Sequence, residues 1–248
     1  MAEHVVGWDG ARYDRVSDPQ ARWGAPLLGR LTLEAPGAVI DAGCGSGRVT
    51  ELLLDQFPHA SVICLDASDA MLDEARVRLA RFGDRVAYVQ DDLSRDLALG
   101  CAVDAVFSSA VFHWVRDHDA LFQRLAAVLR PGGQLVAQWG GAGNVASVIE
   151  AMGRVGLATD HWTFPGLAET ADRLDAAGFV IDDLWIHEEP TDFADDGALA
   201  EFIATVMLVD QPRLRDAASR QMAAREVGRL LPRRSLDYVR ISVVAHRA

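Results

Sequence analysis

The chain has 248 residues, of which 50% are hydrophobic and 24% charged, and its formal net charge is −12. This length suits one α/β domain that can build its core without disulfides. An acidic surface repels phosphate backbones and anionic lipid headgroups, so neither nucleic acid nor a membrane surface is expected as a partner.

Cysteine usage and the absence of targeting signals predict a cytoplasmic protein. The three cysteines match no zinc-binding spacing and are expected to be reduced thiols. The first residues lack the basic and apolar regions of a secretory signal, and no run of ~18 apolar residues could span a bilayer. No His and Asp residues fall at metal-ligand spacing, so no bound metal is expected. The sequence leaves open whether the protein is a monomer or a homodimer.

The first part of the chain alternates between predicted strands and helices. Five short apolar segments are predicted strands: residues 38–41, 61–66, 86–90, 103–108 and 134–139. Stretches with helical periodicity separate them, at residues 48–57, 70–82 and 119–130. Strands that alternate with helices and are apolar on both faces indicate a parallel sheet covered on both sides. Pro131-Gly132-Gly133 cannot continue a helix and predicts a sharp turn into the fifth strand.

The second part of the chain has a different pattern. Residues 140–144 are glycine-rich and predict a flexible loop, after which residues 179–188 and 236–245 are predicted strands. Helices are expected at residues 145–157, 169–177, about 197–209 and about 214–231. The sequence contains no repeat and no linker, so residues 1–248 are expected to form one domain. The arm 1–35 and the region 190–233 are interpreted as insertions that cap a site.

A glycine-rich loop follows the first predicted strand. Asp41 ends that strand, and Gly43, Gly45 and Gly47 follow at alternate positions before a helix begins. Glycines allow the chain to reverse tightly and let a ligand approach bare backbone. A nicotinamide fingerprint requires a further glycine where Arg48 stands, so that fingerprint fails. An acid beside the loop would repel a pyrophosphate and suits a ligand that carries an ammonium group.

Two further acids follow the next predicted strands. Asp66 ends the second strand about twenty residues after the loop, where a carboxylate can accept hydrogen bonds from both ribose hydroxyls of an adenosine. Capping of the next helix is the alternative role, but Ser68 or Asp69 suits it better. Asp92, with Leu93 beside it, follows the third strand and could accept from an adenine amino group; a merely solvated acid is the alternative.

These motifs together resemble those of a known enzyme family. Residues 41–47, 65–72, 92–93 and 129–133 look like the motif series of class I S-adenosylmethionine-dependent methyltransferases, over roughly residues 36–140. A narrower resemblance is to the trans-aconitate methyltransferase-like branch. It rests on Trp8-Asp9 with Tyr13, on residues 110–118, and on Tyr238-Val239-Arg240. Residues 140–233, where substrate contacts would lie, depart from the better-known members of the branch.

The resemblance implies a fold and a cofactor site. The fold would be a Rossmann-like, doubly wound, seven-stranded, mostly parallel sheet whose last strand is antiparallel, with helices on both faces and helical cap elements. Residues 1–35 would be a helical arm, 36–140 the cofactor-binding core, and 141–248 the substrate-side helices and last strands. The implied cofactor is S-adenosyl-L-methionine, with S-adenosyl-L-homocysteine as product. The implied contacts are Asp41, Gly43, Cys44 and Gly45 at the methionine end, Asp66 at the ribose, Ala67, Met71, Asp92 and Leu93 at the adenine, Ser109 near the sulfonium, and Tyr13 and Arg22 closing over the cofactor.

The chemistry of methyl transfer points to acceptor-side candidates. Aligning the reacting atoms can supply ~7–11 kcal/mol, and a base is needed only if the acceptor arrives protonated. His113 is the candidate base, with pocket lining or a packed core role as alternatives, whereas His118 is expected at the surface. Trp114 and Trp139 are candidates for an apolar wall of the pocket, with a plain core position as the alternative. Arg240, with Arg233 and Arg234, is a candidate anchor for an anionic acceptor, and the alternative is a basic edge paired with the acidic surface.

The sequence therefore predicts a methyltransferase that acts on a small molecule, with an oxygen of a carboxylate or hydroxyl as acceptor. One alternative is a protein of the same fold that binds the cofactor without transferring a methyl group. A nicotinamide-dependent oxidoreductase is the other, and the failed glycine fingerprint argues against it.

Overall fold

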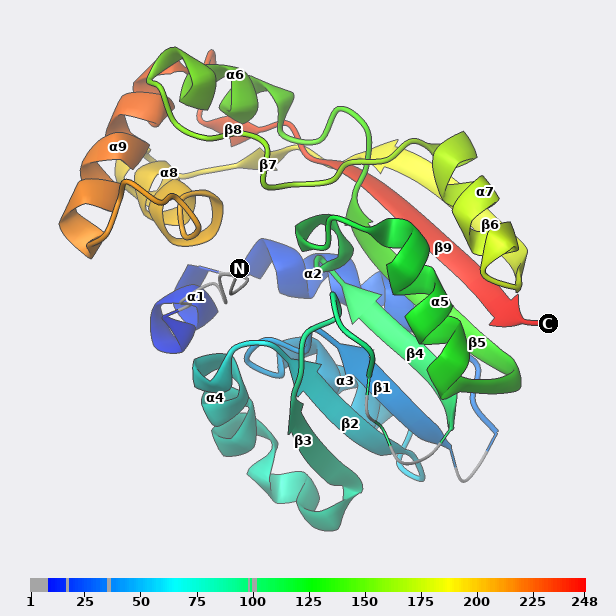
Figure 1. The fold of residues 1–248 in the computed structure, drawn as a ribbon. Helices are drawn as coiled ribbons and strands as arrows, with labels where there is room; N and C mark the ends of the chain where they lie inside the picture. The colour runs from blue at the N-terminus through cyan, green and yellow to red at the C-terminus, as the bar shows by residue number, and fades with distance from the viewer. Residues whose placement is uncertain (1–8, 17, 35–36, 98, 100–101) are drawn as a thin grey trace.

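The fold is built on one large, mostly parallel sheet (Figure 1). The computed structural model describes residues 9–16, 18–34, 37–97, 99 and 102–248, with the side chains of residues 11 and 18–22 left out. Within these residues the sheet has seven strands in the order β3-β2-β1-β4-β5-β9-β6. Their bounds are β1 Ala38–Ala42, β2 Ser61–Asp66, β3 Val86–Gln90, β4 Val103–Ser109, β5 Leu129–Gly140, β6 Phe179–Glu188 and β9 Val239–Arg247.

The strand order creates a crevice in the middle of the sheet. Strands β1 to β5 run parallel, and only β9 is antiparallel to both of its neighbours, β5 and β6. The predicted sheet with an antiparallel last strand is thus confirmed. Because the chain winds outward from β1 in one direction and from β4 in the other, the connections diverge at the carboxyl ends of these two strands. Ligands bind in α/β sheets at this type of switch point.

Helices cover both faces of the sheet because its strands are apolar on both sides. Val39 faces one helical layer and Ile40 the other, and neither is exposed. Successive side chains of a strand point to opposite faces, so two cores form. One core packs under α2 (Asp18–Leu28), α3 (Arg48–Gln56) and α4 (Asp69–Leu79), and the other under α5 (His118–Val128) and α7 (Leu167–Ala176).

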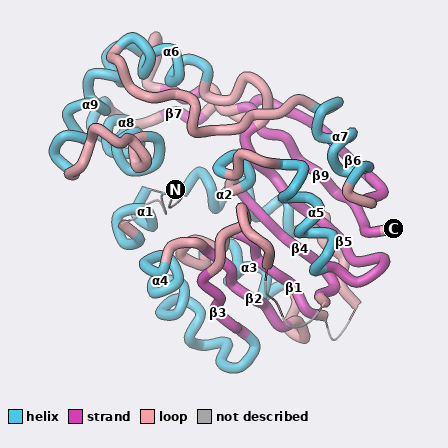
Figure 2. The backbone as a smooth tube through the Cα atoms, viewed as in Figure 1, coloured by secondary structure: helices cyan, strands magenta, loops and turns pink. Residues whose placement is uncertain are grey.

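A second group of elements, here called the cap, lies beyond the carboxyl ends of the central strands (Figures 1 and 2). It has its own apolar cluster, to which Trp23 and Tyr238 also belong. The cap comprises α6 Ala146–Arg154, β7 Thr191–Asp192, α8 Asp196–Phe202 with the π-helical turn Ile203–Met207, α9 Ala217–Leu230 and β8 Ser235–Leu236. Helix α1 (Gly10–Val16) lies against both α4 and the π-helical turn.

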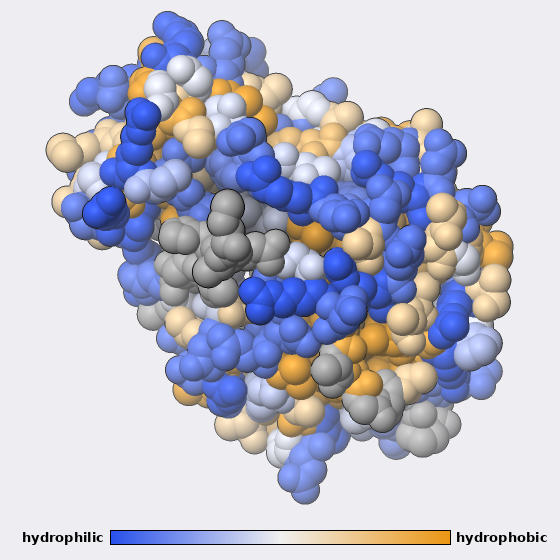
Figure 3. All heavy atoms as spheres, viewed as in Figure 1, coloured by the Kyte–Doolittle hydropathy of each residue, from blue (hydrophilic) through white to orange (hydrophobic). Residues whose placement is uncertain are grey.

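One face of the molecule is shown with all its heavy atoms in Figure 3. On the face drawn in Figure 3, hydrophilic side chains predominate over both the sheet layers and the cap. None of the helices in the described ranges combines the length and the apolar character needed to cross a membrane.

Two predicted boundaries differ from the structure. Strand β5 begins at Leu129, which pairs with Val103, and the regular register resumes only where Gln134 pairs with Ala105. Pro131-Gly132-Gly133 therefore forms an irregular stretch within the strand pairing, with Gly132 at φ +74°, where a separate sharp turn was predicted. The last strand, predicted from residue 236, begins at Val239 because Ser235–Leu236 pairs with β7 instead.

The predicted loop is present just after Gly140, and it is hydrogen-bonded to the start of β9. Gly140 ends β5, the Gly141 amide donates to the Val239 carbonyl, and the Asn144 side chain accepts from the Val239 amide at 2.9 Å. A Cβ at Gly140 would lie 2.6 Å from the Phe164 ring. The glycines here permit close packing against β9 and the neighbouring loop rather than flexibility.

Trp139, a candidate for the pocket wall, and His118, expected at the surface, both lie in the core. Trp139 is fully buried, with its ring centroid 5.2 Å from that of Phe112, and does not line the main cavity. The prediction that Trp139 walls a pocket is therefore wrong. His118 is also buried, and its Nε2 lies 2.9 Å from the Phe112 carbonyl oxygen, so the predicted surface position is wrong as well. Asp117 caps the start of α5 and turns this first helical residue toward the sheet.

The burial of Trp139 predicts its effect on stability. Replacing Trp139 with alanine should lower the free energy of unfolding by ~3–5 kcal/mol, because the side chain leaves a cavity that the rigid sheet cannot close. Urea denaturation followed by circular dichroism measures this change. Trp114→Ala, at a half-buried position, serves as the control and should lose clearly less. Equal losses in the two variants would contradict the assignment of Trp139 to the core.

Candidate functional site

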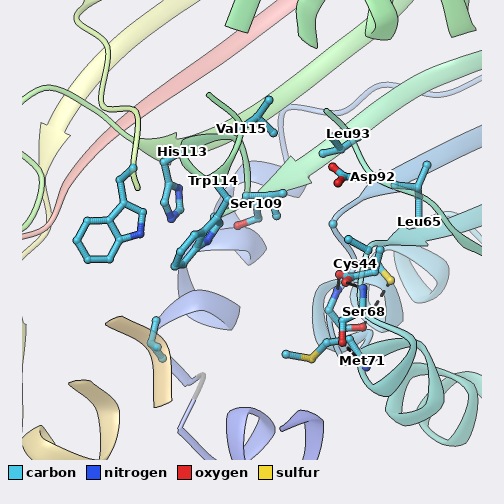
Figure 4. Close-up of a pocket in the computed structure, with 18 of the residues that line it drawn as sticks. Cys44, Leu65, Ser68, Met71, Asp92, Leu93, Ser109, His113, Trp114 and Val115 are labelled. Carbon is cyan, nitrogen blue, oxygen red and sulfur yellow. Dashed lines mark hydrogen bonds between the residues drawn. The ribbon is translucent and has the colours of Figure 1, made fainter. Parts of the chain in front are cut away.

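A large cavity opens at the carboxyl ends of the central strands. Its volume is about 920 Å³, near the large end of the range for small-molecule sites. Residues from β1, β2 and β4 form its floor, and residues from α1 and the cap form its other walls. Figure 4 shows Cys44, Ser68 and Met71 on one side of this space, His113 and Trp114 on the other, and Ser109 between them.

The glycine loop forms one wall of the cavity. Gly43, Gly45 and Gly47 all have positive φ angles, of 78°, 54° and 79°. At Gly43 a Cβ would lie 2.3 Å from a methyl carbon of Val111, so no larger residue fits. At Gly45 a Cβ would meet nothing within 4 Å, so bare backbone faces open space. The loop thus provides the close backbone approach that its glycines predict.

Asp66 holds this loop in place. Its Oδ2 accepts from the Gly45 amide and its Oδ1 from the Ser68 amide, both at 2.9 Å. Burial raises the pKa of Asp66, and these two hydrogen bonds oppose the rise. Ser68, not Asp66, caps helix α4 by accepting from the Met71 amide, as expected. Each carboxylate oxygen of Asp66 retains a lone pair for a ligand, because one oxygen can accept two hydrogen bonds.

Asp41 is the second acid beneath the loop. Its side chain is only 2% exposed, and its Oδ2 accepts a 2.6 Å hydrogen bond from the Thr50 hydroxyl. Burial, and to a smaller extent the charge of Asp66, raise the pKa of Asp41 to about 7. A cationic ligand group beside it would favour the ionised form.

The remaining predicted nucleoside contacts lie on the same side of the cavity. Met71 and Leu93 are nearly buried, and Asp92 accepts from the Ser94 amide through Oδ1 at 2.8 Å. The Cys44 thiol is buried beside Cys64, and both are free. The cavity brings together every predicted cofactor residue whose side chain is described, and the full set is Tyr13, Asp41, Gly43, Cys44, Gly45, Asp66, Ala67, Met71, Asp92, Leu93 and Ser109. Arg22 belongs to α2, but its side chain lies outside the described residues.

Unusual backbone and an unpartnered hydroxyl mark the centre of the cavity. The Ser109 hydroxyl is buried and has no hydrogen-bond partner within the described residues. Ala110 and Val145, both in the wall, adopt left-handed conformations with φ of 63° and 46°. Such conformations cost of order 1–3 kcal/mol each and cluster at functional sites.

His113 lines the cavity as a neutral residue. It lies in the short helical turn Phe112–Trp114, and its Nδ1 accepts from the Gly140 amide at 3.5 Å. Burial lowers the pKa of His113 well below its ordinary value, and the nearby charge of Arg240 lowers it further. With Nδ1 accepting, the proton of the neutral ring is on Nε2, which makes Nε2 a hydrogen-bond donor.

Arg240 places a buried positive charge in the cavity wall. It is 1% exposed, its guanidinium lies 4.3 Å from the centroid of the Trp23 ring, and its Nε donates to Gln138 at 3.4 Å. Burial lowers the pKa of Arg240 to about 10, so it remains charged at neutral pH. Its Nη2 and the Tyr238 hydroxyl both lack partners within the described ranges. The charge of Glu189 acts on Arg240, but no ion pair of Arg240 is seen within the described ranges. A buried charge without a direct ion pair is costly, which indicates an anionic ligand.

The predicted basic cluster is only partly correct. Arg233 and Arg234 are exposed, and Arg234 lies 3.9 Å from Asp196. Neither lines the cavity with Arg240. Arg240 lies on β9 with its side chain directed into the protein, whereas Arg233 and Arg234 lie just before β8 and are exposed to solvent.

The sequence analysis missed an aromatic wall in the loop after α6. His161, Trp162 and Phe164 line the cavity beside Trp114. The Trp162 ring centroid lies 5.8 Å from that of Trp114 and 5.9 Å from that of Phe164. Three aromatic residues within four positions, in a segment with no strand or helix pattern, were the available signal. No group of three His, Cys, Asp or Glu side chains in the described part of the chain could hold a metal ion.

Comparisons with known proteins agree with this geometry. Residues 39–133 match the model of a methyltransferase domain family. Trans-aconitate 2-methyltransferase of Acidovorax ebreus is 43% identical over 131 residues, covering 53% of this chain and 49% of that protein. The enzyme of the same name from Methylobacterium radiotolerans is 38% identical over 161 residues, covering 64% and 58%.

The fold also agrees with solved structures. A putative methyltransferase of Haloferax volcanii, solved with its Trm112 activator, has a TM-score of 0.63 at 19% identity, covering 96% of this chain and 95% of that one. In sequence, the chain spans only about half the length of the curated relatives described above.

The raised pKa of Asp41 predicts a pH dependence of stability. An unfolded aspartate has a pKa of ~3.9, so between roughly pH 4 and pH 7 the folded state binds a proton that the unfolded state lacks. Stability should therefore fall as pH rises through this window, by roughly 1–4 kcal/mol from this group. Asp41→Asn should flatten the fall between pH 5 and pH 8, measured by urea denaturation. An unchanged slope in the variant would contradict the buried, protonated Asp41.

Proposed function

We propose that this chain, which carries a methyltransferase domain of the S-adenosylmethionine-dependent class, transfers a methyl group from that cofactor to a small-molecule carboxylate. One observation carries the proposal: an acid-lined glycine loop and a buried, unpaired Arg240 face the same cavity. The names of the similar trans-aconitate 2-methyltransferases support a carboxylate acceptor. We treat residues 1–248 as one domain, with residues 1–35 as arm, 36–140 as cofactor core and 141–248 as acceptor side.

The cavity residues fit the cofactor at each of its ends. Bare backbone at Gly45 gives a close approach, and Asp41 offers a carboxylate to the ammonium group of the methionine end. Asp66 has lone pairs left for the ribose hydroxyls. The unpartnered Ser109 hydroxyl lies between the two halves of the cavity (Figure 4). Ala67, Met71, Asp92 and Leu93 would then surround the adenine, with Tyr13 and Cys44 at the methionine end.

The bound cofactor supplies an electrophilic methyl carbon on a positively charged sulfur. Transfer of this carbon to the acceptor's carboxylate oxygen would break the carbon–sulfur bond and leave its electron pair on sulfur. The products would be a methyl ester, with one negative charge fewer than the acceptor, and S-adenosylhomocysteine, and no proton would be transferred. An ionised carboxylate needs no base, so the chain's task is to orient the acceptor and exclude water.

Arg240 and His113 have distinct roles in this scheme. The Arg240 guanidinium and the Tyr238 hydroxyl bind the acceptor carboxylate, which leaves its other oxygen free to attack. His113 donates a hydrogen bond from Nε2 and does not act as a base, because its lone pair on Nδ1 faces Gly140. Esterification removes the negative charge, so the product loses its attraction to Arg240 and can leave.

Cofactor binding and turnover test the proposed function. Calorimetry on the purified chain should detect binding of S-adenosylmethionine and S-adenosylhomocysteine. Asp66→Ala should weaken binding by about 1.5–3 kcal/mol, or roughly 10- to 150-fold, the scale for hydrogen bonds to a charged group. Asp69→Ala, at an exposed acid of the same turn, should leave binding unchanged. Formation of S-adenosylhomocysteine with trans-aconitate and simpler carboxylates then measures transfer.

The outcomes of this test separate the alternatives. Absence of binding to either sulfur nucleoside would refute the proposal. Stabilisation by NAD instead would favour the oxidoreductase. Binding without transfer to any acid would favour a non-methylating protein of this fold.

The role of His113 is tested by comparing two substitutions. If His113 donates from Nε2, glutamine can replace that donor, so His113→Gln should retain activity within about tenfold while His113→Ala loses more. If His113 were a base, both variants should lose a comparable ~10²–10⁴-fold. The pH profile of kcat/KM adds a second readout: a donor that stays neutral contributes no limb of its own, so any limb between pH 6 and 8, such as one from Asp41, should persist unchanged in His113→Gln.

A further inference from the structure

The acceptor side of the cavity contains one buried positive charge. Of the arginines in the wall, Arg116 is exposed at the rim, Arg48 donates to the Asp14 carbonyl, and Arg124 lies 3.4 Å from Asp96. His113 is kept neutral by burial, which lowers its pKa, and burial likewise lowers the pKa of His161. Within the described residues, Arg240 alone is a fully buried cation of this cavity.

The cavity wall also contains an acid and apolar side chains. Asp210 lines the cavity from the segment after the π-helical turn, together with Val206 and Met207 of that turn. A second or third carboxylate on the acceptor would therefore find no second buried cation among the described residues, only neutral polar groups such as His113 and His161 beside aromatic rings, methyl groups and this acid. Placing an unpaired charge in such surroundings is strongly unfavourable.

The aromatic wall is held rigidly next to the cation. The Thr163 amide donates to the His113 carbonyl, and the Ala142 amide to the Pro165 carbonyl, both at 2.9 Å. The Trp162 ring stacks on the Phe164 ring with 5.9 Å between their centroids, and it meets the Trp114 ring edge-on at 65°, so the three rings form an angular apolar wall. Such walls bind hydrocarbon or aromatic groups by burial and by edge or stacking contacts.

The sheet register brings the cation and the wall together. Arg240 on β9 is the direct partner of Gly140 on β5. Gly140 in turn packs so closely against Phe164 that a Cβ would clash with the ring at 2.6 Å. The guanidinium and the aromatic surface therefore belong to one subsite, with the Tyr238 hydroxyl as a second unpartnered polar group.

We propose that the acceptor is a monocarboxylate with an apolar body. Its carboxylate binds Arg240 and Tyr238, and its body lies against Trp114, Trp162 and Phe164. This inference rests on the proposed function and makes the acceptor class narrower than carboxylates in general. It predicts that polycarboxylates are poor ligands, in contrast to what the names of the similar enzymes suggest.

Direct binding of defined acids tests the proposal. Calorimetry with the full chain saturated with S-adenosylhomocysteine compares trans-cinnamate, phenylacetate and indole-3-acetate with cinnamamide and trans-aconitate. At least one aryl monocarboxylate should bind at least tenfold more tightly than trans-aconitate. Cinnamamide should bind at least tenfold more weakly than cinnamate, because it lacks the charge for Arg240.

Matched variants assign the two parts of the subsite. Trp162→Ala should weaken binding of the preferred monocarboxylate at least tenfold and leave S-adenosylhomocysteine affinity within twofold, and Trp162→Phe should restore much of the loss. Trp185→Phe, on β6 and outside the cavity lining, is the control and should change neither affinity. Arg240→Gln should reduce cinnamate binding to the level of cinnamamide. If the Arg240→Gln variant does not fold, Arg240→Lys, which keeps the charge, replaces it as the variant to be measured.

The outcomes distinguish this inference from the proposed function. Failure of the wild type to bind S-adenosylhomocysteine would overturn the proposed function and, with it, this inference. Normal cofactor binding with equal or tighter binding of trans-aconitate would overturn the inference alone. Normal cofactor binding without binding of any of the three monocarboxylates would also overturn it.

Discussion

The carboxylate of Asp66 is the interaction on which the site depends. By accepting from the Gly45 and Ser68 amides, it ties the loop after β1 to the start of the helix after β2. Gly43, Gly45 and Gly47 all have positive φ, and glycine has no intrinsic preference for one backbone conformation. The Asp66 carboxylate is therefore needed as an acceptor to select one conformation of the loop. The adjacent strands supply the rest, because the Gly43 and Cys44 amides donate to the Leu65 carbonyl. Because these hydrogen bonds hold the loop from the side of β2, its side toward the cavity is left free for a ligand.

Charge is distributed unequally along the cavity. Two acids, the buried Asp41 and the partly buried Asp66, lie beneath the glycine loop, whereas the buried cation Arg240 lies beside the cap. Each group is costly without a partner of opposite charge, since the cavity wall between them is largely apolar. A ligand pair with an ammonium at one end and a carboxylate at the other would reduce both costs. The separation of acids and cation thus determines the arrangement of the two ligands: the cofactor's ammonium would lie at the glycine loop and the acceptor's carboxylate beside the cap.

Helix α1 joins the cofactor side of the cavity to the cap. Asp14 accepts from the Ser46 hydroxyl at 2.6 Å and pairs with Arg78 of α4 at 2.8 Å. From the same helix, Arg12 donates to Gln221 of α9 at 3.0 Å. These contacts are local to one turn of helix, yet they connect the glycine loop with the cap helices. Helix α1 therefore contacts both the glycine loop and the cap.

Features that depend on short stretches of chain were predictable from the sequence. The five parallel strands, the loop at Gly43–Gly47 and the cap residue Ser68 follow from periodicity, glycine spacing and helix-capping preference, all of which act within about ten residues. Only the tertiary structure decided which side chains reach the cavity. Trp139 and His118 were buried by α5 packing on the sheet, Arg240 was turned inward by its pairing with Gly140, and Trp162 and Phe164 were brought to the site by a loop without regular structure. These outcomes depend on contacts between residues distant along the chain, and local pattern carries no information about such contacts.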